Sequence, residues 1–112
     1  MQAHRSLSDE NWDAAATMAR GSMQVALRHQ GAAGKRLVDQ IDDLASKGLL
    51  PPIMREWSHN VRDLGNDAAH PEPEGKGTDP KDARDIVEFL DYLLQYLYDL
   101  PERIKKYRER KT

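Results

Sequence analysis

Three polar side chains, Arg62, Asn66 and His70, recur at intervals of four residues and form the group in this sequence best suited to chemistry. A histidine exchanges protons near neutral pH, and an arginine binds a phosphate through paired hydrogen bonds. Together they suit metal-independent cleavage of RNA, in which the 2′-hydroxyl is the nucleophile. They suit simple binding of a phosphate or a carboxylate equally well. The plainer alternative is that Asn66 and His70 satisfy backbone groups at a helix end while Arg62 is solvated.

The helix that would carry these side chains is predicted to run from about Ile53 to about His70. Its apolar residues recur at helical spacing and share one stripe: Ile53, Trp57, Val61, Leu64 and Ala68. At roughly 100° per residue, the three polar side chains lie nearly opposite this stripe. Pro71 and Pro73 prevent the helix from continuing.

Small residues on the same helix indicate an interface between two copies of the chain. Three of them lie between the apolar and polar faces: Ser58, Gly65 and Ala69. Arg62 and His70 are two turns apart, about 12 Å along the axis, so one copy does not bring them together. If two copies pair antiparallel across a two-fold axis near Asn66, Arg62 of one copy faces His70 of the other. We therefore predict a homodimer with His70, Arg62 and Asn66 as its catalytic candidates.

Basic residues gather in two other places. Residues 102–112 contain six lysines and arginines against two glutamates, and Gly34-Lys35-Arg36 begins another predicted helix. A basic segment attracts polyanions, and a helix start offers free amides to an anion. The candidate nucleic-acid-binding residues are therefore Lys35, Arg36, Arg103, Lys105, Lys106 and Arg108. The alternatives are a turn between two helices and a solvated helix end whose cations complement the helix dipole.

Composition excludes several classes of protein. The chain has 112 residues and no cysteine, so we expect one domain without disulfides, zinc ribbons or iron–sulfur clusters. Its histidines lack metal-ligand spacing, so we expect no metal and no cofactor. A net charge of −2 argues against a general nucleic-acid coat. No apolar run is long enough for a membrane span, which favours a cytoplasmic protein without membrane contact.

Apolar periodicity predicts an all-α fold, an antiparallel bundle of four to five helices. One helix runs from Asn11 to about Arg28, and a second contains Leu37 to Ala45 and stops near Gly48. A longer one starts at Thr78 or Asp79, where a cap precedes Pro80, and Pro101 either kinks it or begins a fifth helix. We expect a flexible N-terminus over residues 1–10, a helical domain over 11–102 and a basic helix end over 103–112.

The central motif resembles a known signature. Arg62-x-x-Gly65-Asn66-x-Ala68-Ala69-His70 is similar to that of a bacterial domain of unknown function, which occurs alone and on restriction enzyme subunits. Supporting features are Gly34-Lys35-Arg36-Leu37, Gly48-Leu49-Leu50 and Tyr96-Leu97-Tyr98-x-Leu100-Pro101, so the resemblance spans about residues 11–102. That family resembles the HEPN superfamily of helical bundles, which are often dimeric and common in toxin–antitoxin, restriction and anti-phage systems.

The resemblance implies a function and also a departure from it. Active HEPN ribonucleases place an arginine directly before a polar residue, and a histidine follows later. Asn66 and His70 match the polar and histidine positions, but Gly65 occupies the arginine position and Arg62 lies one turn earlier. The resemblance therefore favours a non-catalytic HEPN-like module for dimerisation and for partner or nucleic-acid contact in a prokaryotic defence or restriction system. The alternatives are a metal-independent, toxin-like endoribonuclease and a small helical protein outside that setting.

Overall fold

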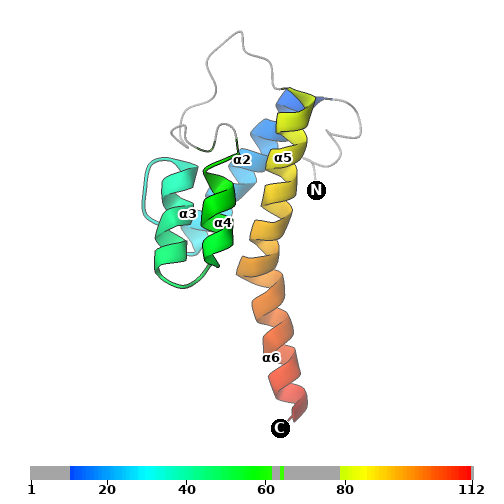
Figure 1. Ribbon diagram of the computed structural model, residues 1–112. Coiled ribbons are helices and arrows are strands. Elements are labelled where there is room, and N and C mark those ends of the chain that lie inside the picture. The colour runs from blue at the N-terminus through cyan, green and yellow to red at the C-terminus, as the bar shows by residue number, and fades with distance from the viewer. Residues whose placement is uncertain (1–10, 62–63, 65–78, 112) are drawn as a thin grey trace.

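A computed structural model describes residues 11–61, 64 and 79–111, and this part of the chain is all-α, as predicted (Figure 1). Its elements in chain order are α2 (Trp12–His29), α3 (Leu37–Ser46), α4 (Pro52–Ser58), α5 (Pro80–Leu94), the π-helical turn η1 (Gln95–Asp99) and α6 (Leu100–Lys111). The predicted start of α5 is confirmed, because the Asp79 side chain accepts a hydrogen bond from the Lys81 amide at 2.8 Å, directly before Pro80. A polar cap followed by proline in the first turn begins a helix.

The pair α2 and α5 forms the centre of the fold, and the two helices lie parallel. At their starts, the Arg84 guanidinium lies 5.2 Å from the centre of the Trp12 ring. Beyond their other ends, His29 Nδ1 lies 3.0 Å from the Tyr98 hydroxyl, and the two rings stack. The prediction of an antiparallel bundle is therefore wrong for this pair. α5 therefore begins at the end of the molecule where α2 begins (Figure 1).

An antiparallel hairpin of α3 and α4 packs beside this pair (Figure 1). Gly48 closes α3 with φ +79°, a conformation that glycine adopts without strain. Across the hairpin, Asp42 Oδ1 of α3 accepts from Arg55 Nε at 3.2 Å and contacts His59 Nε2 at 2.9 Å. These exposed polar contacts fix the two helices to each other on the outer side of the hairpin.

Helix α4 ends at Ser58, so the prediction of one continuous helix from Ile53 to His70 is wrong at residues 59–61 and 64, whereas residues 62–63 and 65–70 lie outside the described residues. Side chains compete for the last carbonyls: the Ser58 hydroxyl donates to Arg55 O at 2.6 Å, and Asn60 Nδ2 donates to Glu56 O at 3.0 Å. Such bonds offer the backbone an alternative to the helical ladder. A turn over residues 59–60 follows, and further along the chain the Leu64 carbonyl accepts from the Val38 amide at 2.9 Å.

The core lies between α2, the hairpin and α5. Its largest fully buried side chains are Met23, Leu27, Leu37, Ile41, Leu44, Met54, Leu64, Phe89, Leu90 and Leu93. Trp57 closes one side, with its ring at 5.0 Å from Phe89 and 5.5 Å from Tyr92 in edge-on contacts. Val61 and Leu64 are buried as predicted, but Ile53 is 66% exposed because it lies on the outer side of the shortened α4.

The junction at Pro101 determines the course of α6. Proline has no amide hydrogen, and inside a helix its ring clashes with the carbonyl four residues earlier, here that of Leu97. The π-helical turn Gln95–Asp99 widens the helix directly before Pro101, and the chain continues as α6 instead of breaking. The alternative in which a fifth helix begins at Pro101 agrees with α6, which starts at Leu100. Figure 1 shows α6 projecting beyond the rest of the molecule.

Candidate functional site

The candidates Arg62, Asn66 and His70 lie outside the described residues, as do Gly65 and Ala69. Ser58, the remaining interface candidate, is described and is 1% exposed. Its hydroxyl donates to a carbonyl within α4, and its side chain is buried inside this chain instead of lying on the surface. The interface stripe predicted from a continuous helix is therefore wrong at Ser58, because α4 ends there and the chain turns.

Arg36 is engaged at the start of α3. Its guanidinium donates to both carboxylate oxygens of Asp39, at 2.9 and 2.8 Å, and its own amide donates to Asp39 at 3.4 Å. These hydrogen bonds raise the pKa of Arg36 and hold the pKa of Asp39 below its ordinary value. The residue thus closes the first turn of α3, while the neighbouring Lys35 is exposed. Figure 1 shows α3 and α6 in separate parts of the molecule, so the two predicted basic groups do not form one surface.

The loop after α2 is held to α3 by Asp43. This carboxylate pairs with Lys47 at 2.7 Å and accepts from the Ala33 amide at 2.9 Å. Both contacts favour the ionised form, the lysine more strongly, and they lower the pKa of Asp43. Ionised Asp43 therefore stabilises the connection between α2 and α3.

Acid is expected to weaken this connection. A carboxyl group whose pKa is lowered in the folded state contributes stability above its unfolded pKa and loses it as the pH falls through the folded value. The urea midpoint should therefore be constant above about pH 5 and fall progressively as the pH is lowered from there. In Asp43→Asn the drop should be smaller, because that contribution is already missing. Unfolding is monitored by circular dichroism. A drop of equal size in the wild type and in Asp43→Asn would contradict this account.

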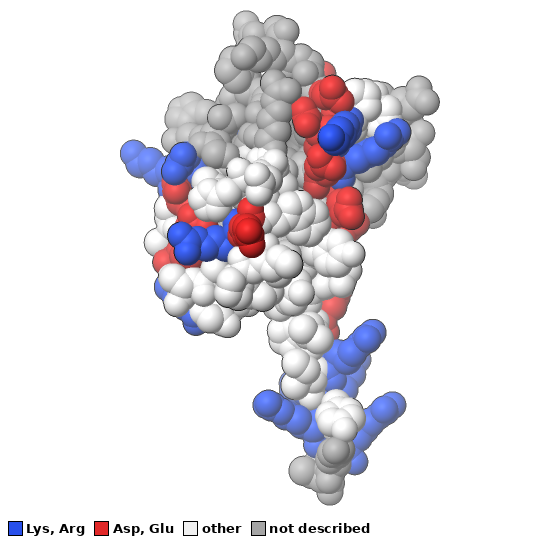
Figure 2. Space-filling model, in the orientation of Figure 1, with Lys and Arg blue, Asp and Glu red and all other residues white. Residues whose placement is uncertain are grey.

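The described cations of α6 form the most extended charged surface that the structure shows. Residues 101–110 are all exposed, and five of them are cations: Arg103, Lys105, Lys106, Arg108 and Arg110. Figure 2 shows blue side chains around α6, whereas along α5 red acidic side chains gather with some blue ones among them. Four of the cations were candidates from the sequence, and Arg110 joins them. Because α6 is basic and α5 is mainly acidic, a polyanion is attracted to α6 and not to α5.

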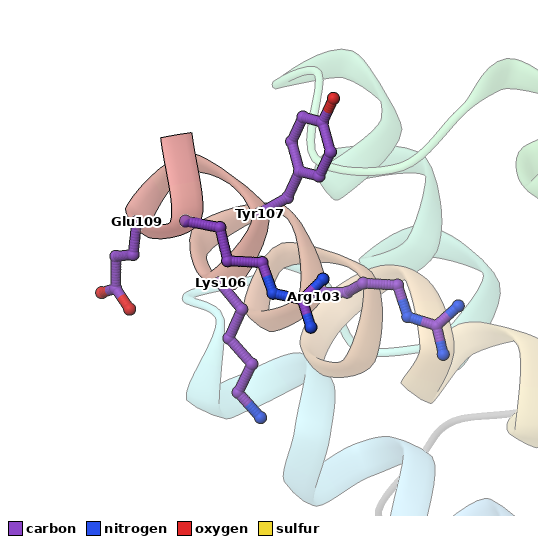
Figure 3. Close-up of a pocket in the computed structure, with 5 residues that line it drawn as sticks. Arg103, Lys106, Tyr107 and Glu109 are labelled. Carbon is purple, nitrogen blue, oxygen red and sulfur yellow. The ribbon is translucent and has the colours of Figure 1, made fainter. Parts of the chain in front are cut away.

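An apolar stripe lies in the middle of the basic surface. Leu100, Ile104 and Tyr107 are 43%, 43% and 55% exposed, and their spacing of four and three residues places them on one face. Arg103, Lys106, Tyr107, Glu109 and Arg110 line a shallow depression on this helix alone. Figure 3 shows Tyr107 and Glu109 leaving the helix in different directions. The sequence carried this signal, but the interpretation of residues 102–112 considered only their charge.

Metal binding and membrane insertion find less support in the described residues. Within residues 11–61, 64 and 79–111, no three histidine or acidic side chains come together as metal ligands would. The helices of the same part of the chain include none with the length and hydropathy of a bilayer span. The Asp42–Arg55–His59 group lies at the surface and joins α3 to α4. This structural role explains why the three side chains lie together.

These features define an all-helical module with a bundle of α2–α5 and a projecting, amphipathic, basic terminal helix. The chain belongs to the family described as domain of unknown function (DUF4145), whose model matches residues 1–110. Searches of curated proteins and of solved structures found no match.

Proposed function

We propose that this chain is a non-catalytic, HEPN-like helical module of a prokaryotic defence or restriction system, and that it contacts an acidic macromolecule through α6. The observation that supports it is the exposure of α6, where five cations face two carboxylates over residues 101–110. A folded domain that buries none of these side chains leaves them available for an external anion. Gly65, at the position where HEPN ribonucleases carry arginine, supports the non-catalytic part of the proposal.

Binding of polyanions by the full chain tests the proposal. The probes are a fluorescent single-stranded RNA oligonucleotide and a helical peptide rich in glutamate, each titrated over a series of salt concentrations. The double substitution Arg103→Gln and Arg108→Gln should weaken binding of at least one probe about tenfold and flatten its salt dependence, because fewer counterions are then released. The control Arg28→Gln with Lys81→Gln removes the same charge from exposed residues on α2 and α5 and should leave binding unchanged.

Three outcomes would reject the proposal. The first is that neither probe binds. The second is that the α6 variant binds as tightly as the wild type, and the third is that the control variant loses as much affinity as the α6 variant. A further result would replace it with the endoribonuclease alternative, namely RNA cleavage that persists in EDTA and disappears in His70→Ala.

A further inference from the structure

We propose that α6 docks against a helix of another protein that carries acidic residues along both sides of its own apolar stripe. This inference rests on the proposed function, because it names the kind of acidic partner that α6 contacts. The observation behind it is the order of side chains around α6, with an apolar stripe in the centre, arginines on either side and carboxylates at the back.

The stripe has the spacing of a coiled-coil seam. Leu100, Ile104 and Tyr107 follow intervals of four and three residues, which are the a and d positions of a heptad with Ile104 at a. One turn earlier, Leu93 and Leu97 have the same spacing and are buried in the bundle. The contact between His29 and Tyr98 lies where α2 ends, and the stripe of α6 follows it along the chain. The exposed stripe is thus the type of face that the bundle covers elsewhere with a second helix.

Arginines occupy the positions beside this seam. Arg103 and Arg110 fall at g, and Arg108 falls at e, at about 70–90° from the centre of the stripe. Glu102 and Glu109 both fall at f, at about 170° from it. In a coiled coil the e and g side chains meet those of the partner helix and select it by charge. The partner helix therefore carries glutamate or aspartate at its own e and g positions.

The same pattern argues against a second copy of this chain. Whether two α6 helices paired parallel or antiparallel, arginines would oppose arginines along the seam, and like charges at these positions are repulsive. The pattern also distinguishes a helix from a nucleic acid. A phosphate backbone lying between Arg103 and Arg108 would cover the apolar stripe with charge and gain nothing from burying it.

The anchoring of α6 favours docking of a helix. The bundle holds η1 through buried Leu97 and through the Tyr98 hydroxyl near His29, so the start of α6 is fixed before a partner arrives. A preorganised helix loses less conformational entropy on binding than an unfolded segment does. A partner helix then adds its apolar stripe to a surface that already has the required spacing.

The test uses the full chain and a synthetic peptide of several heptads with isoleucine at a, leucine at d and glutamate at e and g. A second peptide carries lysine at e and g. Wild-type protein should bind the glutamate peptide and not the lysine peptide. Ile104→Ser with Tyr107→Ser should weaken binding of the glutamate peptide at least about tenfold, which corresponds to about 1.4 kcal/mol. The matched control is Val25→Ser, which removes an apolar side chain that is 71% exposed on α2 and should leave binding unchanged.

A charge exchange provides the second arm. Arg103→Glu, Arg108→Glu and Arg110→Glu should abolish binding of the glutamate peptide and create binding of the lysine peptide, because the seam is retained while its flanks change sign. All substituted side chains are exposed, so circular dichroism and the urea midpoint should stay close to those of the wild type.

The outcomes separate this inference from the proposed function. If the glutamate peptide binds equally well without Ile104 and Tyr107, α6 attracts polyanions by charge alone and only the docking inference falls. If RNA binds and the peptide does not, the partner is a nucleic acid and the inference falls again. Self-association that Ile104→Ser abolishes would assign the seam to a second copy. If neither peptide nor RNA binds, both proposals fail.

Discussion

Phe89→Ala is expected to destabilise the fold by about 3–5 kcal/mol, a large part of the roughly 5–15 kcal/mol that holds a domain of this size together. Phe89 is fully buried in α5, and its ring meets the edge of Trp57 at 5.0 Å. Alanine would remove the apolar area of the ring and leave a cavity between α4 and α5. The short α4 should then loosen first, because its Trp57 packs directly against Phe89 and Tyr92 of α5.

Urea unfolding monitored by tryptophan fluorescence and by circular dichroism measures this effect. Phe89→Leu is the matched control, because it keeps most of the buried volume and should cost less than about 1.5 kcal/mol. In a Trp12→Phe background, where Trp57 is the remaining tryptophan, the fluorescence of Phe89→Ala should change at lower urea than the helical signal does. A loss below about 1 kcal/mol for Phe89→Ala would show that the core collapses around the missing ring.

Local sequence patterns were sufficient to place most of the helices. The stripe of α2 and the buried Leu37, Ile41 and Leu44 of α3 follow from apolar spacing, and the start of α5 follows from Asp79 and Pro80. In each case neighbouring residues supply both the helical tendency and the cap. Such information is contained in a window of a few residues, which is why it can be read before the fold is known.

The errors arose where contacts between distant residues decide the structure. The apolar spacing around Trp57 and Val61 continues through Leu64, but the bond from the Val38 amide to the Leu64 carbonyl requires the chain to leave the helix. The parallel course of α2 and α5 likewise depends on contacts between distant residues, such as that of Trp12 with Arg84. Neither fact has a local signal, since both depend on which surfaces of the folded chain meet.

The candidate site shows the same division. The cations of residues 102–112 and the spacing of Leu100, Ile104 and Tyr107 were both present in the sequence. That these side chains share a helix beyond the bundle follows only from the structure, because burial of α6 against another helix would have produced the same spacing. Arg36 was predicted from the sequence to bind an anion from outside the chain. In the structure its guanidinium instead binds the carboxylate of Asp39, three residues later.

Gly34→Ala is expected to destabilise the chain by about 2–3 kcal/mol, a large effect for the addition of one methyl group. Gly34 has φ +133°, in a region that residues with a side chain rarely adopt. A Cβ at this position would lie 2.7 Å from Asp39 Cβ and 3.3 Å from the backbone nitrogen of Gln40, both of which are fixed in the first turn of α3. The chain must therefore move away from α3 to accommodate it.

That movement also removes a buried hydrogen bond. Gln40 is 2% exposed, and its Nε2 donates to the Gly34 carbonyl at 3.0 Å, whereas its Oε1 is buried and has no hydrogen-bond partner among the described residues. Displacing Gly34 leaves the amide unpaired inside the protein, and a buried donor without a partner costs about 1–3 kcal/mol. Backbone strain and the loss of this bond therefore both lower the stability. The loop that contains Gly34 should separate from α3 as a result.

Gly48→Ala is the matched control for this prediction. Gly48 also has a positive φ, +79°, but a Cβ there would meet no atom within 4 Å, so only the backbone preference is lost, about 1–2 kcal/mol. Urea unfolding should rank the two variants with Gly34→Ala as the less stable. Gln40→Leu should stabilise the Gly34→Ala background more than it stabilises the wild type, because only in that background is the Nε2 group unpaired as well as Oε1. Equal losses in the two glycine variants would show that the loop moves freely and that its contact with α3 contributes little.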